Sequence, residues 1–265
     1  YIKNSIISAG SIEEAETFDK IVLGIMSGSS FVCVQGYTKG LLVHAKEYAG
    51  RTFATPNTEP SVRGPQEAFV ETLKINIGMI RKRIKDPNLT LDMSLIGRRT
   101  KTEMVIAYIK GVANEEIINE VKERLLLIDI DGQANTVQIG QLIVENPNSI
   151  YPLIQLTERP DKVVSALSEG RVAVIMNGSP NVLIAPVTLP MLMQSADDYF
   201  ENWIIASIIR ISRYMALFLS SLFPALYIAI TSFNPGMLPT NLALSIAATR
   251  SGVPFPTLVE ALLMV

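Results

Sequence analysis

Residues that commonly perform catalysis or bind metals are scarce in this sequence. It has one cysteine, Cys33, and one histidine, His44, which are too few ligands for a zinc site and too few thiols for a disulfide. Asp129 and Asp131 are a carboxylate pair, but no third oxygen ligand is near, so we interpret them as exposed turn acids. Cys33 lies in an apolar run and is expected to be buried. We therefore predict no enzyme activity, no metal and no cofactor.

Charged residues in and after a Pro- and Thr-rich stretch are better candidates for binding a partner. Arg63 lies within the sequence SVRGP, and Glu67 and Glu71 follow it within two helical turns. Arg63 either anchors an interface or a ligand, or it pairs locally with these acids, where an exposed ion pair adds little stability. The residue types alone leave both interpretations open.

Two further charged groups also have a binding and a structural interpretation. Arg98 and Arg99 form a basic group that either contacts anionic lipid headgroups or an acidic partner, or is a solvated surface. Nucleic acid is not the expected partner, because the chain has a net charge of −2. Glu158, Arg159 and Asp161 surround a proline at a strand-to-helix junction, where Asp161 is the expected N-cap.

The C-terminal part of the chain differs from the rest, because residues 214–249 contain no Asp, Glu, Lys, Arg or His. Within this run, Tyr214–Phe233 has the length that an α-helix needs to cross a bilayer. Pro224 lies in its middle, and such kinks are tolerated in membrane spans. The alternative is a buried core helix, but such a helix usually has one polar face and this segment has none.

The segment that follows, 234–249, is too short and too interrupted to cross a membrane alone. Pro235 and Pro239 break it, and the backbone groups left free must be covered by other protein. We therefore expect contacts with partner subunits or with further copies of the chain in the membrane.

Residues typical of a membrane interface precede the predicted span. Trp203 and Tyr214 are amphipathic aromatics of the kind enriched at the lipid headgroups, and Arg210 and Arg213 lie just before the apolar run. By the positive-inside rule, these two arginines place the preceding part of the chain in the cytoplasm.

The positions of apolar residues predict a mixed α/β fold before the membrane segment. We expect strands at 21–25, 31–35, 41–46, 104–111 and 152–156, and a hairpin of two strands within 171–186. We expect helices at 65–85, at 115–128 with Asn114 as N-cap, and at 161–170. The fold class is therefore α/β, with two small mixed α/β subdomains and a C-terminal transmembrane helical region. The predicted domains are 1–88 with a connecting helix, 89–195, and 196–265 with a juxtamembrane helix and the start of a membrane domain.

Five stretches in consistent order resemble the GerA family of spore germination proteins, specifically its A-type subunits, including the SpoVAF paralogues. They are EPSVRGPQEAFVETL (59–73), IGRRTKT (96–102), YIKGVAN (108–114), TERPDKVVSALSEGRVAV (157–174) and SFNPGMLPTNLALSIAATRSGVPFPTLVEALLM (232–264). Residues 1–50 match the family only in general character.

The resemblance implies a place in the inner membrane of the bacterial endospore, with the N-terminal domain on the cytoplasmic, spore-core side. It implies assembly with a transporter-like B subunit and a lipoprotein C subunit into a nutrient receptor, and a homo-oligomeric ion channel in the membrane. The cytoplasmic domain would then serve assembly or signal relay. The alternative is a small-molecule sensor, similar to a substrate-binding protein, that clamps a ligand between the two subdomains.

Overall fold

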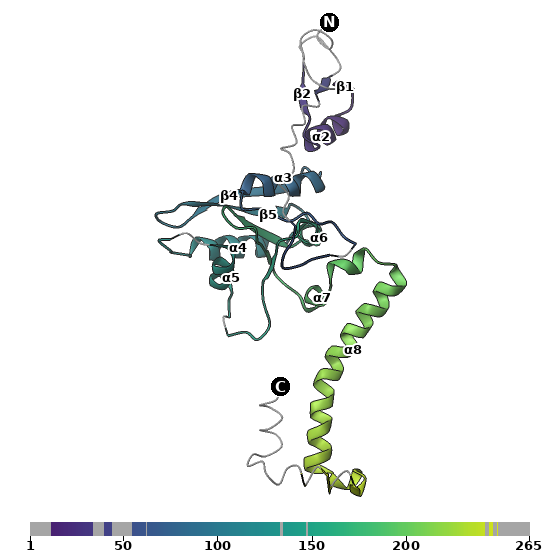
Figure 1. The fold of residues 1–265 in the computed structure, drawn as a ribbon. Helices are drawn as coiled ribbons and strands as arrows, with labels where there is room; N and C mark the ends of the chain where they lie inside the picture. Colours follow the sequence, from purple (N-terminus) through teal and green to yellow (C-terminus); the bar gives the residue numbers. More distant parts are fainter. Residues whose placement is uncertain are drawn as a thin grey trace. The chain divides into compact units, whose positions relative to one another are not determined.

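A five-stranded antiparallel sheet organises most of the chain before residue 193 (Figure 1). This computed structural model describes residues 12–33, 40–43, 55–61, 63–132, 135–146, 148–241, 244–245 and 248. The strand order of the sheet is β4-β5-β7-β8-β6. Its strands are β4 (Leu89–Ile96), β5 (Thr102–Ile109), β6 (Gln155–Thr157), β7 (Val172–Met176) and β8 (Val182–Ala185).

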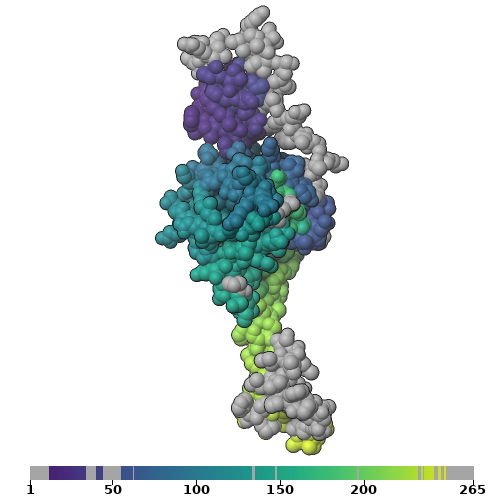
Figure 2. Space-filling view, turned by 90° about the vertical axis from the view of Figure 1, so that its left-hand side faces the viewer, coloured from purple at the N-terminus to yellow at the C-terminus, as the bar shows by residue number. Residues whose placement is uncertain are grey.

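Helices cover both faces of this sheet. They are α3 (Leu73–Arg83), α4 (Glu115–Leu126), α5 (Thr136–Ile143) and α6 (Pro160–Ser168). Successive strand residues point to opposite faces, so Val105 packs with α3 and α6 whereas Ile106 packs with α4 and α5. Strands β7 and β8 are buried at every position, which explains their continuous apolar sequences. In the space-filling view, these blue to green segments pack into one continuous body (Figure 2).

Local capping confirms one helix start and corrects another. The side chain of Asn114 accepts a hydrogen bond of 2.9 Å from the Glu116 backbone N–H, so the predicted cap of α4 is confirmed. The predicted cap at Asp161 is wrong, because Arg159 is the N-cap of α6 and Asp161 already lies in the first turn. The reason is that Pro160 occupies the first helical position, which its fixed φ angle favours.

Several elements of this sheet domain follow the sequence pattern, and others do not. The hairpin of β7 and β8 is confirmed, with Val172 paired to Ala185. Strand β4 and helix α5 were not predicted. Helix α3 begins at Leu73, eight residues after its predicted start, because residues 65–72 make contacts of a different kind that are described below.

A second, three-stranded sheet lies near the start of the chain and has the order β1-β3-β2, with both pairs antiparallel. Its elements are β1 (Ile12–Ala15), α2 (Phe18–Met26), β2 (Ser30–Val32) and β3 (Gly40–Val43). The predicted strand at 21–25 is wrong, because these residues belong to α2. A short apolar run does not by itself distinguish a buried strand from a helix. Here Gly24 lies against Leu42, and a Cβ at Gly24 would meet that side chain at 2.6 Å.

The other predictions for this region have mixed outcomes. Strands β2 and β3 overlap the segments predicted at 31–35 and 41–46, each starting one residue earlier, and the parts 34–35 and 44–46 lie outside the described residues. The expected burial of Cys33 is wrong, because its thiol is exposed just after the end of β2. His44 lies outside the described residues.

The chain divides into two compact units, Tyr1–Leu192 and Met193–Val265. The described elements of the second are η1 (Ala196–Tyr199), α8 (Trp203–Ile228), η2 (Ala229–Phe233) and η3 (Pro235–Met237). Mixed α/β architecture with a long apolar C-terminal helix confirms the predicted fold class. The finer boundaries after residues 88 and 195 stay predictions.

Helix α8 joins the expected juxtamembrane helix and the expected span in one element. The side chain of Asn202 caps it by accepting a hydrogen bond of 3.1 Å from the Ile204 backbone N–H. Trp203–Thr231, 29 residues long, is sufficiently long and apolar to cross a membrane, and its most apolar window has a mean hydropathy of 1.7. No part of that window is buried against other described residues. Pro224 lies inside α8 and does not end it.

Candidate functional site

The largest fully buried side chain among the described residues is charged. Arg159, at the junction between β6 and α6, has a relative exposure of 0%. Its Nε and Nη2 donate hydrogen bonds of 3.1 and 2.8 Å to the two carboxylate oxygens of Asp161. Its Nη1 donates one of 3.2 Å to the Glu59 carbonyl oxygen. The fork to Asp161 is among the stronger pairings in proteins, and the bond to Glu59 joins segments 100 residues apart.

Glu59 completes this group around the buried arginine, which we call the arginine clamp and define as Glu59, Thr157, Arg159, Asp161 and Lys162. One Glu59 carboxylate oxygen accepts a hydrogen bond of 2.9 Å from the Thr157 hydroxyl, and the other accepts one of 2.9 Å from the Lys162 ammonium. Every charged member of the clamp therefore has an oppositely charged partner within it. The chemistry is that of a structural anchor, since each charge is paired within the group.

The clamp fastens an extended segment, 57–61 and 63–70, which we call the strap. The Glu158 carboxylate accepts a hydrogen bond of 3.1 Å from the Asn57 backbone N–H. The Glu158 backbone carbonyl accepts one of 2.8 Å from the Phe69 backbone N–H. At the end of the strap, the buried side chain of Asn76 makes two hydrogen bonds to the backbone of Val70. It accepts one of 2.9 Å from the Val70 N–H and donates one of 2.5 Å to the Val70 carbonyl. These bonds use backbone groups that a helix would need, which explains why α3 starts only at Leu73.

Glu67 and Glu71, the acids predicted to accompany Arg63, make contacts with other residues. Glu67 pairs with Arg83 at 2.6 Å, and the backbone carbonyl of Glu71 accepts 2.7 Å from the Gly178 N–H. Arg63 itself is exposed on the strap. The structure therefore brings Glu158, Arg159 and Asp161 together with the strap, whereas a binding role of Arg63 stays a prediction.

The basic group at the β4–β5 turn is attached to a neighbouring loop. Arg98 forms an ion pair with Asp129, and its backbone N–H donates 2.9 Å to the Ile130 carbonyl. Arg99 is exposed at the tip. Asp129 is 58% exposed, so it is a turn acid as expected. No cluster of three or more metal-binding side chains occurs within the described ranges.

A second arginine–aspartate arrangement precedes the apolar part of α8. Asp198, with 3% of its side chain exposed, accepts hydrogen bonds of 2.9 and 3.3 Å from Nη1 and Nη2 of Arg213. Arg213 also donates to the Met193 carbonyl. Nε of Arg210 lies 3.5 Å from Asp198, within ion-pair range but without hydrogen-bond geometry. The Arg210 guanidinium stacks 4.9 Å over the ring of Tyr199.

We call this group, Asp198, Arg210 and Arg213, the juxtamembrane clasp. Burial alone raises the pKa of the Asp198 carboxyl, but hydrogen bonds from Arg213 and from the Ser195 backbone outweigh it and hold that pKa below its usual range. Asp198 therefore stays ionised near neutral pH. It was not among the predicted site residues, although an acid 12 and 15 residues before two arginines could have indicated it.

The other predicted interface residues lie along or beyond α8. Trp203 and Tyr214 are 76% and 41% exposed. Pro224 is half-buried within the helix, Pro235 begins η3, and Pro239 is exposed after it. Hydroxyl groups in the helix bond back to carbonyls one turn earlier, as from Ser207 to Trp203 at 2.7 Å and from Thr231 to Tyr227 at 2.7 Å.

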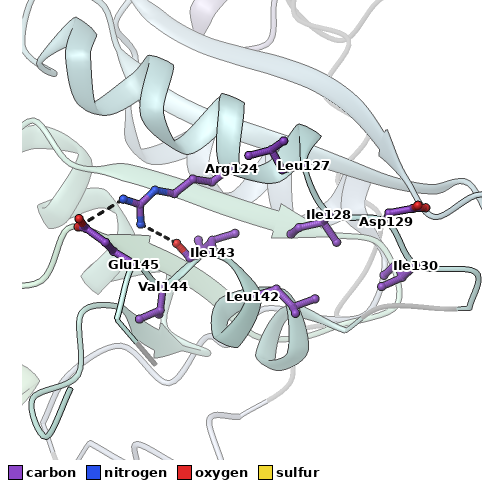
Figure 3. Close-up of a pocket in the computed structure, with 9 residues that line it drawn as sticks. All are labelled: Arg124, Leu127, Ile128, Asp129, Ile130, Leu142, Ile143, Val144 and Glu145. Atoms are coloured by element: carbon purple, nitrogen blue, oxygen red, sulfur yellow. Dashed lines mark hydrogen bonds and ion pairs between the residues drawn. The ribbon is translucent and has the colours of Figure 1, made fainter. Parts of the chain in front are cut away.

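A groove lies between the C-terminal ends of α4 and α5 (Figure 3). It has a volume of about 380 Å³ and is lined mainly by apolar side chains. At its edge, Arg124 donates 2.8 Å to the Ile143 carbonyl and pairs with Glu120 and, at 3.4 Å, with Glu145. The groove lies within the second predicted subdomain, and so it is not the predicted cleft between subdomains.

The full chain, residues 1–265, matches the family described as Bacillus/Clostridium GerA spore germination protein. The chain belongs to the GerA family. It is 43% identical over 249 residues to spore germination protein A1 of Bacillus subtilis (strain 168), covering 94% of this chain and 52% of that protein. It is 31% identical over 242 residues to stage V sporulation protein AF of the same organism, covering 91% and 49%.

A solved structure supports the fold of this GerA-family chain. The crystal structure of the N-terminal domain of the A subunit of the Bacillus megaterium spore germinant receptor GerK3 is similar, with a TM-score of 0.50 and 33% sequence identity. The similarity covers 68% of this chain and 64% of that one. The chain spans about half the length of the curated relatives it matches.

The clamp accounts for two of the stretches that first suggested the GerA family. The first, 59–73, contains all of the strap but its first two residues, and the second, 157–174, begins with the clamp residues Thr157, Arg159 and Asp161. The two stretches contact each other in the fold, since the hydrogen bonds of the clamp join residues of one to residues of the other. The clasp residues, by contrast, lie outside all five stretches.

Proposed function

We propose that this GerA-family chain belongs to a subunit of a spore germinant receptor in the inner membrane of the spore. Residues 1–192 would lie in the cytoplasm and serve assembly and signal relay, without enzyme activity. Helix α8 would contribute to an oligomeric ion channel, with B-type and C-type subunits as partners. The relatives' names, the apolar α8 and the two arginines at its start support this proposal.

The juxtamembrane clasp is the observation that carries the relay part of the proposal. Asp198 belongs to the turn η1, whereas Arg210 and Arg213 lie two and three turns into α8. The segment leading to α8 is therefore tied to the side of the helix as well as to its first residue. A shift of η1 would act on α8 through these bonds, as a two-state relay requires.

Asp198→Asn in the full-length subunit tests this role. The change keeps the shape of the side chain and removes its charge, which leaves two arginines beside a neutral amide. Loss of a charge-assisted bond is worth about 2 kcal/mol, enough to shift a two-state equilibrium more than tenfold. Nutrient-triggered ion release from spores should therefore slow about tenfold.

Asp131→Asn is the matched control, since it removes the same charge from an exposed residue outside the clasp. Spores with this variant should respond like wild type. Equal responses of the two variants, at equal protein levels in the membrane, would refute the relay role of the clasp.

A further inference from the structure

The two faces of the five-stranded sheet carry helices of opposite charge. On one face, α3 contains no acidic residue, and its exposed side presents basic side chains that continue just past its end. These exposed residues are Lys74, Arg81, Lys82 and Lys85. On the other face, α4 presents an acidic stripe. Its exposed residues are Glu115, Glu116, Glu120 and Glu123.

Each charged helix borders exposed apolar side chains on its own face. Met93 of the edge strand β4 is paired with Val105, which packs against α3, and paired residues point to the same face. Met93 and Leu95 are 67% and 61% exposed there. On the opposite face, Leu126 and Leu127 at the end of α4 are 78% and 81% exposed, beside the groove between α4 and α5.

We propose that the α4–α5 face of one copy of this chain docks on the α3–β4 face of a second copy. The two surfaces are complementary, since each combines an apolar patch with exposed charge that is mainly of one sign, and the dominant signs are opposite. They lie on opposite sides of one sheet, so they cannot meet within a single copy. The contact is therefore head-to-tail, and repeated contacts of this type form a ring when the rotation closes.

The groove itself favours a protein surface over a small molecule. Its volume of about 380 Å³ would hold a small ligand. However, Arg124, its one basic lining residue, is already bonded to the Ile143 carbonyl, Glu120 and Glu145. The exposed acids of the neighbouring α4 stripe, such as Glu116 and Glu123, match the lysines and arginines of the α3 face. This contact would supply the assembly role proposed above, and it can be tested without measuring germination.

Cysteine cross-linking in the full chain tests the contact directly. In a Cys33→Ser background, Arg81→Cys and Glu123→Cys place one thiol on each proposed surface. A disulfide requires Cα atoms within about 7 Å, and the sheet separates these two positions within one copy. The double variant, in detergent or in membranes, should give a ladder of cross-linked species on mild oxidation.

Single variants and a mixture define the geometry. Each single variant should remain uncross-linked, and a mixture of the two should give dimers only. Phe18→Cys combined with Arg81→Cys is the matched control, because Phe18 is 78% exposed on α2, which packs on the three-stranded sheet and belongs to neither surface. A symmetric dimer from either single variant, or no ladder from the double variant, would overturn the proposal.

Charge reversal gives an independent readout. Arg81→Glu should lower cross-linking between cysteines placed at Lys74 and Glu116 about tenfold, because it sets like charges opposite each other. Adding Glu123→Arg in the same chain should restore it to within about twofold. Unchanged cross-linking with Arg81→Glu would refute the electrostatic match. Failure here would leave the clasp experiment unaffected, because that experiment measures ion release alone.

Discussion

Replacing Arg159 should destabilise the sheet domain more than replacing any exposed arginine. Arg159→Ala removes three hydrogen bonds, two of which join a guanidinium to a carboxylate. Breaking a buried charged pair by removing one partner costs about 3–5 kcal/mol. Asp161 is 21% exposed, so water would partly hydrate its carboxylate, and we expect the lower end of that range.

The expected loss of about 3 kcal/mol corresponds to a fall in Tm of about 6–12 °C for a domain of this size. Circular dichroism of the full chain in detergent would measure it. Amide hydrogen exchange adds a local readout, because the Phe69 N–H donates to the Glu158 carbonyl beside the clamp and should exchange faster.

Two further variants make this reasoning refutable. Arg159→Lys keeps the charge but cannot form the fork, so its Tm should lie between those of wild type and Arg159→Ala. Arg99→Ala removes an exposed arginine and should change stability by less than about 0.5 kcal/mol. If Arg159→Ala unfolded within about 1 °C of wild type, the clamp would not be the anchor of the strap.

Three other predictions follow from the geometry. Ile208→Pro breaks α8 at a cost of about 3 kcal/mol and should abolish nutrient-triggered ion release, whereas Ile208→Ala should leave it intact. Normal ion release from spores with the Ile208→Pro variant would contradict the relay. A hydrogen bond from Lys122 is the main cause that lowers the pKa of Asp92, against the effect of burial, so this pair stabilises the fold above the ordinary carboxyl pKa of about 4. The stability difference between wild type and Asp92→Asn in urea should therefore be constant from about pH 5 to 8, begin to fall near pH 4 and disappear only below the lowered pKa of Asp92. A difference that persisted in still stronger acid would exclude this cause. Thermal shift of the full chain with amino acids, sugars and nucleosides should stay below about 1 °C, and a larger ligand-dependent shift would favour the small-molecule sensor.

The sequence predicts those elements whose signals are local. The hairpin of β7 and β8 has a strong turn signal, and the Asn114 cap lies directly before its helix, so both were predicted. The strand at 21–25 was misassigned because only tertiary packing, here Gly24 against Leu42, decides between strand and helix for so short a run. The late start of α3 likewise depends on bonds from the strap to residues about 90 positions away.

The residues of the candidate site likewise divide into those that the sequence predicts and those that only the structure shows. Glu158, Arg159 and Asp161 were predicted as a group because they are adjacent in the sequence. Their long-range partner Glu59 was not, since nothing in the residue types shows that a strap crosses this junction. Arg210 and Arg213 were predicted as membrane-interface residues, but their pairing with Asp198 depends on the turn that folds η1 against α8.

Hydrogen bonds hold the chain at the point where it leaves the sheet domain. Arg171 donates 2.7 Å to the Pro186 carbonyl and 3.2 Å to the Thr188 hydroxyl, which fixes the backbone after β8 to the beginning of β7. The clasp begins at Met193, whose carbonyl accepts a bond from Arg213. The short helix α7, Leu189–Leu192, is all that separates these two anchored points. A long flexible linker would absorb a displacement of the last strands. In the proposed relay, a connection of four residues would transmit more of such a displacement to the clasp than a long linker would.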